Sequence, residues 1–256
     1  MSRHSATARI SALLLGALFL VLSMAAQAPA PTPAAVPLRE EPHHHLVFEN
    51  SYVRAYYVEV TPHESTLQHR HDLSYFGVLL SGGPATNAPA AAATQQSPES
   101  PRAIFSPGGI SHTVGNPADV PFRNVTVELL HPQGKARNRC RELVQGQPLE
   151  QCDMPAAGQP SNPFHYAVFE TAEILVEYWE IGASFTAKSW DSRRDTLLVA
   201  LDGASVSAAA GLDSRNAARG GLLWIPAGSN PVFKTSPDHP GHFFAITFKD
   251  SAPAQR

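Results

Sequence analysis

The chain of 256 residues is long enough for one large or two small domains. Its 43% hydrophobic residues are ordinary for a globular protein, whereas its 16% charged residues are few. Its formal net charge is −3 and no basic stripe runs along it, which argues against nucleic acid as a partner. The 23 prolines and the scarcity of long helical patterns favour strands and turns.

The N-terminal residues predict an exported protein. Arg3 and Arg9 precede an apolar run and then several small residues, which together indicate a secretory signal peptide over residues 1–28. The apolar run of about 15 residues is shorter than the roughly 20 that a membrane-spanning helix needs, and an uncleaved anchor is the alternative. We therefore expect a periplasmic or secreted protein without a stable membrane span after cleavage, and an Ala- and Pro-rich linker over residues 29–42.

Runs rich in Val, Ile, Tyr and Phe predict strands along the rest of the chain. In the first half these runs are residues 45–49, 52–60, 75–80 and 122–130. In the second half they are residues 166–170, 174–181, 196–201, 221–225 and 242–248. Residues 43–45, three consecutive histidines, are interpreted as a polar lead into the first strand, with loose metal binding as the alternative. Residues 81–102 lack apolar periodicity and are interpreted as a long loop, for which a mobile spacer is favoured over a lid.

Three histidines suggest a metal site. His69 and His71 are two positions apart, so their side chains point to the same face if the segment is extended. His112 follows a tight turn, Pro107-Gly108-Gly109. Imidazole nitrogen is a good ligand for Fe, Mn, Ni, Cu and Zn. A His-x-His pair alone is weak evidence, and surface or core histidines are the alternative.

The two blocks that contain these histidines resemble the two sequence motifs of the cupin superfamily. The second block matches the motif at every defined position from the turn onward, namely Pro107, Gly109, His112 and Asn116. The resemblance implies an all-β fold of double-stranded β-helix (jelly-roll) barrels. It also implies one divalent transition metal held by His69, His71 and His112.

The first block matches at His69 and His71 but departs from the motif at two other positions. His63 stands where the motif has Gly, and Tyr75 or Phe76 stands where it has a Glu ligand. The chain therefore resembles the three-His members of the superfamily, which include some non-heme iron oxygenases.

Two further residues are candidates for catalysis. Tyr75 would serve as a weak ligand or an acid/base, whereas filling of the barrel interior is the alternative and the favoured interpretation. Glu128 lies in an alternating segment in which Val125 and Val127 share the opposite face. Glu128 would act as a general base if its face lines the barrel, whereas a solvated outer face is the alternative and the favoured interpretation.

Residues 132–162 form a connector that contains both cysteines of the chain, Cys140 and Cys152. In an exported protein such a pair predicts a disulfide, with two free thiols as the alternative.

The second half repeats the first. The Pro226-Ala227-Gly228 turn corresponds to Pro107-Gly108-Gly109, and at the same spacing Gly182 corresponds to His63. The three histidines then correspond to Lys188, Trp190 and Pro231, which are not a metal-ligand set. We expect two tandem barrels, a metal-binding one at residues 43–131 and a degenerate one at residues 163–250.

Function does not follow from the fold, because cupins include dioxygenases, isomerases, lyases and plain binding proteins. The three-His set favours a mononuclear-metal enzyme, oxygenase-like, that acts on a small organic molecule. A non-redox isomerase or lyase and a non-catalytic protein that binds a metal or small ligand are the alternatives. The sequence leaves a homodimer open.

Overall fold

The computed structural model describes residues 34–81, 86–88, 92–93, 102–155, 163–182, 193–202, 204–208, 215–229, 231–234 and 240–249. These residues contain one 3-10 helix, η1 (Leu38–Glu40), and otherwise strands and irregular segments, which confirms the all-β prediction for this part of the chain. No helix within it has the length and hydropathy of a membrane span. The predicted signal peptide, Lys188 and Trp190 lie outside the described residues.

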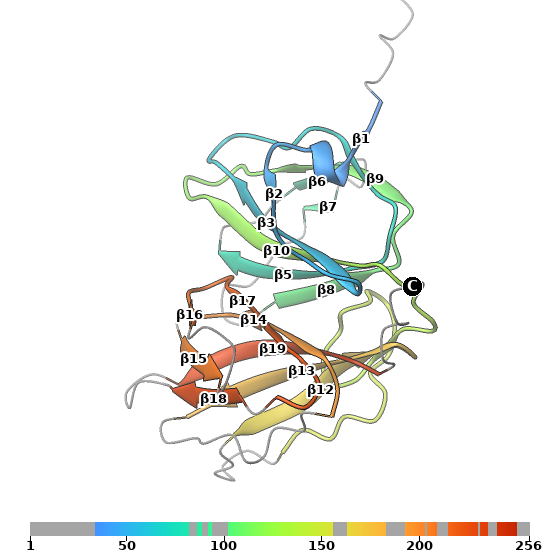
Figure 1. Cartoon of the computed structure of the whole chain (residues 1–256). Coiled ribbons are helices and arrows are strands. Elements are labelled where there is room, and N and C mark those ends of the chain that lie inside the picture. The colour runs from blue at the N-terminus through green and yellow to red at the C-terminus, as the bar shows by residue number, and fades with distance from the viewer. Residues whose placement is uncertain are drawn as a thin grey trace, which may run out of the picture. The chain divides into compact units, whose positions relative to one another are not determined.

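Two sheets enclose the interior of the first half, which we call the first barrel (Figure 1). In spatial order, the β4–β9 sheet contains β1 (Val36–Pro37), β4 (His69–His71), β9 (Ile110–Gly115), β6 (Thr86–Ala88) and β7 (Ala92–Ala93). The β3–β10 sheet contains β2 (His44–Glu49), β3 (Val53–Val60), β10 (Phe122–Leu129), β5 (Tyr75–Ser81) and β8 (Arg102–Ser106). A small apolar cluster of Leu38, Tyr56, Val58, Val60 and Phe122 fills part of the interior.

The second half forms a second barrel from two further sheets (Figure 1). The β13–β19 sheet contains β11 (Arg137–Asn138), β12 (Phe164–Glu170), β13 (Ile174–Ile181), β19 (Gly241–Phe248), β14 (Thr196–Ala200) and β17 (Leu222–Ile225). The β15–β18 sheet contains β16 (Arg215–Ala217), β15 (Ala204–Ala208) and β18 (Pro231–Lys234). Its buried interior cluster is apolar throughout: Trp179, Ile181, Leu198, Ala200, Leu223, Ile225, Phe233, Phe243 and Ala245.

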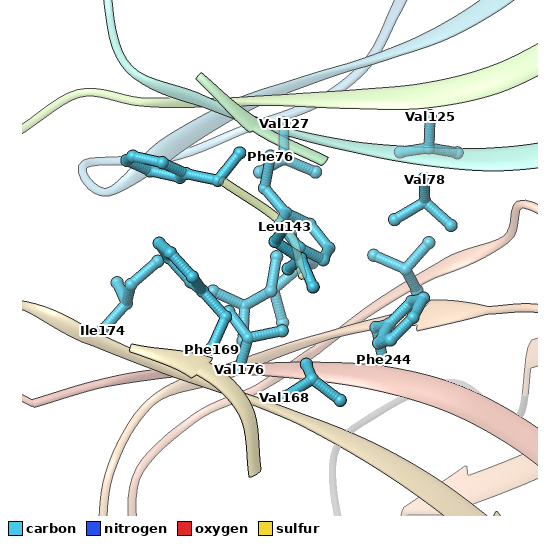
Figure 2. Close-up of a cluster of buried hydrophobic side chains, with 14 of the residues drawn as sticks. Phe76, Val78, Val125, Val127, Leu143, Val168, Phe169, Ile174, Val176 and Phe244 are labelled. Carbon is cyan, nitrogen blue, oxygen red and sulfur yellow. The ribbon is translucent and has the colours of Figure 1, made fainter. Parts of the chain in front are cut away.

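The two barrels share a third apolar core, in which the β3–β10 sheet packs on the β13–β19 sheet. Phe76, Val78, Val125 and Val127 of the first barrel meet side chains such as Phe244 of the second (Figure 2). Because side chains alternate along a strand, the face of β10 opposite Val125 and Val127 points into the first barrel. Both faces of β10 are therefore buried along most of its length, one against the second barrel and one around the candidate site.

Two segments differ from the expected loops. Within the predicted linker, Val36 and Pro37 pair in parallel with His69 and Arg70, and Leu38 is buried. Within the predicted 81–102 loop, Thr86 and Ala88 pair with Gly115 and Thr113 of β9. The interpretation of residues 81–102 as a mobile spacer is wrong for these described residues, since backbone pairing with a sheet edge orders a segment that has little apolar surface.

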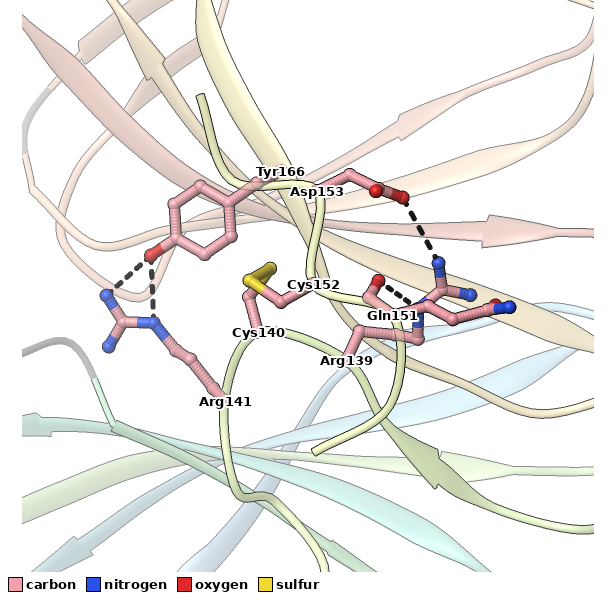
Figure 3. The surroundings of a disulfide bond; sticks show 7 residues. All are labelled: Arg139, Cys140, Arg141, Gln151, Cys152, Asp153 and Tyr166. Atoms are coloured by element: carbon pink, nitrogen blue, oxygen red, sulfur yellow. Dashed lines mark hydrogen bonds and ion pairs between the residues drawn. A yellow bond between two sulfur atoms is a disulfide. The ribbon is translucent and has the colours of Figure 1, made fainter. Parts of the chain in front are cut away.

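The predicted disulfide between Cys140 and Cys152 is confirmed (Figure 3). It closes the connector, whose Leu143 is buried in the core that the barrels share. Arg139 beside it donates to the Gln151 carbonyl, and Arg141 donates to the hydroxyl of Tyr166 on β12 (Figure 3).

Candidate metal centre

His69, His71 and His112 lie together inside the first barrel, as the strand period and the pairing of β4 with β9 dictate. Arg70 between the first two is exposed, whereas His69 and His71 are 0% and 2% exposed. His69 is the direct cross-strand partner of His112 in the antiparallel register. The ring centroid of His112 lies 4.6 Å from that of His69 and 5.0 Å from that of His71.

The hydrogen bonds of these rings leave nitrogen atoms without partners. His69 Nδ1 lies 2.9 Å from the Leu67 carbonyl oxygen and so carries the proton, which leaves Nε2 as a bare lone pair. His69 Nε2 and His71 Nδ1 are buried without any hydrogen-bond partner. His71 Nε2 and His112 Nε2 face each other at 3.1 Å. Buried polar atoms normally have partners, so orphan imidazole nitrogens within a histidine cluster suit a metal ion.

Burial keeps the three imidazoles neutral. It lowers the pKa of His69 to about 4, of His71 to about 2 and of His112 to about 4. A neutral imidazole has the free lone pair that metal binding requires, so at neutral pH no proton has to leave. The donor set thus fits the transition metal that the sequence predicted.

A fourth histidine, His44, belongs to the same cluster. Ligand atoms of His44, His69 and His71 all lie within 4.8 Å of one another. Its ring centroid lies 4.7 Å from that of His69 and 6.2 Å from that of His71. The interpretation of residues 43–45 as a polar lead is wrong for His44, because it is buried on the inner face of β2 while His45 is exposed.

Glu41, which the sequence analysis did not single out, is the carboxylate behind this cluster. It is 1% exposed and accepts hydrogen bonds from the His44 ring at 2.6 Å and the His43 ring at 2.9 Å. The backbone amides of His43 and Leu67 also donate to it. Burial by itself would raise the pKa of Glu41, but these hydrogen bonds outweigh burial and lower the pKa to about 2.

The Tyr75 side chain lies beside the histidines. Its ring stacks on the His71 ring with centroids 4.2 Å apart, and it is buried. Burial raises the pKa of the Tyr75 phenol, and a hydrogen bond with the Ser106 side chain opposes that shift. The stacked ring fixes the His71 imidazole, and the phenol stays protonated at neutral pH.

Glu128 faces the barrel interior, so the favoured interpretation of a solvated outer face is wrong. It is 4% exposed and is the cross-strand partner of Tyr75. Tyr56 donates to it at 3.4 Å, and an Arg54 nitrogen lies 3.7 Å away. Burial raises the pKa of Glu128, while the charge of Arg54 acts against the rise. The reason for the error is that the alternating valines pack on a second barrel rather than on the interior of their own.

Three residues within the two motif blocks shape the backbone around the site. His63, in place of Gly, has φ of 62°, so the left-handed conformation is kept although a side chain is present. Gly108 has φ of 79°, and an added Cβ would lie 2.3 Å from the Leu73 carbonyl oxygen. Asn116 is buried and its amide donates to the carbonyls of Val60, Thr61 and Val120.

No protein family model and no curated protein matches the chain. Solved structures do. AerE from Microcystis aeruginosa is 12% identical, covers 82% of this chain and 99% of its own, and has a TM-score of 0.52. Salicylate 1,2-dioxygenase from Pseudaminobacter salicylatoxidans is 14% identical, with 77% and 71% covered and a TM-score of 0.50. A cupin domain from Bordetella pertussis is 24% identical over 34% of this chain and 90% of its own, with a TM-score of 0.31.

The two longer likenesses extend over most of the chain and show its fold. The fold consists of two tandem double-stranded β-helix barrels of the cupin type, as the sequence predicted. The first barrel contains a buried histidine cluster able to hold a metal ion.

Proposed function

We propose that this protein is a mononuclear-metal enzyme, oxygenase-like, that acts on a small organic molecule. The observation that carries the proposal is the cluster of buried, neutral imidazoles with orphan nitrogens at His69 and His71. The fold shared with salicylate 1,2-dioxygenase supports the oxygenase form. His69, His71 and His112 are the ligands in this proposal.

The chain's own residues would hold and orient the reactants. A bound Fe, Mn, Ni, Cu or Zn ion would supply Lewis acidity and, for the redox-active metals, electron transfer. Tyr75 keeps His71 in place by stacking. Glu128 and Tyr56 provide a buried acid/base pair on the same inner surface, where a substrate proton would be held or moved.

Metal analysis and oxygen consumption test this proposal. The protein purified from its native compartment is expected to contain one transition metal ion per chain. Loaded with Fe(II), it is expected to consume O₂ in the presence of a phenol, a diketone or a thiol. Metal binding without O₂ consumption across such a panel would remove the oxygenase form.

A non-redox isomerase or lyase is the second candidate, and Glu128 is the observation that favours it. Its pKa is raised by burial, as suits a general acid/base in a barrel that also holds a metal site. Turnover with redox-inert Zn(II) would support this candidate over the oxygenase. A protein that binds the metal firmly but turns over nothing in either assay would be a binding protein.

We further propose that the mature protein is exported. The apolar N-terminal run and the Cys140–Cys152 disulfide support an oxidising compartment. Fractionation of cells and N-terminal sequencing of the mature chain test this. Light scattering on that chain decides between a monomer and a homodimer.

A further inference from the structure

The first barrel lacks the acidic ligand that the sequence motif places after the His-x-His pair, and Tyr75 or Phe76 stands there instead. Phe76 points away from the site into the core that the barrels share. Tyr75 stacks flat on His71 rather than approaching the ring nitrogens end-on. Neither residue replaces the carboxylate, so any fourth ligand comes from another element.

His44 on β2 occupies a suitable place. Its ring is closer to His69, at 4.7 Å between centroids, than the rings of His69 and His71 are to each other at 5.1 Å. It reaches the cluster from the β3–β10 sheet, whereas the other three histidines come from the β4–β9 sheet. Ligand atoms of His44, His69 and His71 lie within 4.8 Å of one another, so side chains from both walls of the barrel meet at the site.

The bond to Glu41 determines which nitrogen of His44 is available. Nδ1 lies 2.6 Å from Glu41 Oε2, so a neutral His44 carries its proton there and keeps a lone pair on Nε2. A carboxylate that accepts from the outer nitrogen of a metal-bound histidine is the common arrangement, because it fixes the tautomer and strengthens the donor. Glu41 also accepts from the Leu67 amide, and the Leu67 carbonyl in turn accepts from His69 Nδ1.

We propose that His44 is a fourth metal ligand, through Nε2, and that Glu41 is the positioning residue that orients it. The inference rests on the proposed metal site and adds a ligand that the sequence motif does not contain. The motif's Glu would bind the metal directly, whereas here the negative charge lies on Glu41, on the far side of the His44 ring. The ligands themselves are then all neutral nitrogens, a set that suits Fe, Ni, Cu or Zn better than Mg or Ca.

The competing interpretation is a His44–Glu41 ion pair that only stabilises the fold. In that case His44 would carry a proton on both nitrogens and would not bind metal. A spectroscopic count of the ligands separates the two interpretations. If His44 and Glu41 form only an ion pair, substituting His44 leaves the spectrum of the bound metal unchanged.

The test compares the full mature protein with His44→Ala, Glu41→Gln and the control His45→Ala, whose exposed ring points out of the barrel. Each protein is loaded with Cu(II), its dissociation constant is measured by chelator competition, and its coordinated nitrogens are counted by EPR. We expect His44→Ala to lose one nitrogen and bind Cu(II) more weakly. We expect Glu41→Gln to keep the nitrogen and bind about 10- to 100-fold more weakly. The control should match the parent.

Melting temperatures of the metal-free proteins establish that the variants are folded, and His44→Glu guards against a misfolded alanine variant. A carboxylate at this position would restore tight binding with one nitrogen fewer than the parent. If both folded His44 variants bind Cu(II) with the parent's affinity and nitrogen count, His44 is not a ligand, and the three-His proposal stands alone. If the parent binds no transition metal at all, the proposed function fails together with this inference.

Discussion

The two barrels have the same architecture but differently lined interiors. Between the sheets of the first barrel lie four histidines, Glu128 and a small apolar cluster, whereas the described interior of the second is built around a large apolar cluster that includes Trp179 and Phe243, with a hydroxyl pair, Thr196 and Thr247, beside it. Burying orphan nitrogens costs about 1–3 kcal/mol each, whereas a buried Phe contributes about 1.5–3 kcal/mol. We infer that one fold serves metal binding in the first half and stability in the second. We propose that the second barrel binds no metal.

The largest effect that would sharpen this comparison is the loss of metal when a first-barrel ligand is removed. His69→Ala should reduce metal affinity by more than the roughly 10- to 100-fold that loss of an outer-shell partner costs, because a donor atom itself is lost. Metal content by elemental analysis is the measurement. The matched control is His165→Ala, an exposed histidine of the second half. Equal metal content in His69→Ala and the parent would end the assignment.

The mirror experiment removes a large side chain from the second interior. Phe243, 1% exposed, packs near Phe233, and Phe243→Ala should lower the free energy of unfolding by about 3–5 kcal/mol because it leaves a cavity. Urea unfolding measures this. Metal affinity of the folded fraction should equal that of the parent. A variant that keeps its stability but loses the metal would contradict the division of roles.

Removing the disulfide should have an intermediate effect on stability and none on the metal. Cys140→Ser with Cys152→Ser opens a short loop, for which chain-entropy models give roughly 3 kcal/mol. Thermal unfolding of the double variant, compared with the disulfide-bonded parent, measures the loss, and the reduced parent should match the variant. A metal affinity that falls along with the stability would show that the connector supports the first barrel directly.

Acid should weaken the metal-free protein through the first interior. Folding lowers the pKa values of His69, His71 and His112. Below pH 6.5 the unfolded chain therefore binds more protons than the folded protein, and the free energy of unfolding decreases as the pH is lowered. Each imidazole contributes at most about 1.4 kcal/mol per pH unit. Urea titrations between pH 7 and about 5.5, above the range where Glu41 of the unfolded chain takes up its proton, measure the slope.

A control and an opposing group sharpen this pH experiment. His71→Leu should reduce the slope, because one of the titrating rings is gone. His242 of the second half acts in the opposite direction, since hydrogen bonding to Asp202 raises its pKa and its contribution is lost as the pH rises. A slope that His71→Leu leaves unchanged would mean that other groups dominate.

The smallest effect concerns a polar contact between the barrels. Tyr52 donates to Asp195 at 2.9 Å, and Tyr52→Phe should lower the free energy of unfolding by about 1 kcal/mol while the ring keeps its packing on Phe248. Equilibrium unfolding in urea is sensitive enough to measure it. A loss several times larger would show that this hydrogen bond, rather than the shared apolar core, holds the barrels together.

Local patterns predicted nine of the 19 described strands, including every strand of seven or eight residues, and three of the histidines. The predicted strand at Ile174–Ile181 has the observed bounds, and others differ by one or two residues. His69 and His71 could be placed because their spacing and the strand period determine a common face. His44 could not be placed in the same way, since three consecutive histidines do not show which one points inward.

Residues whose role depends on distant partners could not be predicted. Glu41 becomes a buried carboxylate only because Leu67 and His44 come to it from other segments. Glu128 was assigned to the wrong side because its strand is buried on both faces, and an alternating pattern does not say which face lines a site. Thr86 and Ala88 pair with β9 through backbone atoms, which composition does not reveal.

The apolar core that the two barrels share has a consequence for how the chain diversifies. Two identical subunits joined through such a face would carry every substitution twice, once in each copy. Here the two partners are encoded separately within one polypeptide, so histidines can be kept in one interior while the other is filled with Phe243 and its neighbours. A protein that consists of the first half alone would lack the separately encoded partner. It would expose Phe76, Val78 and Val125 to water and should precipitate or pair with itself.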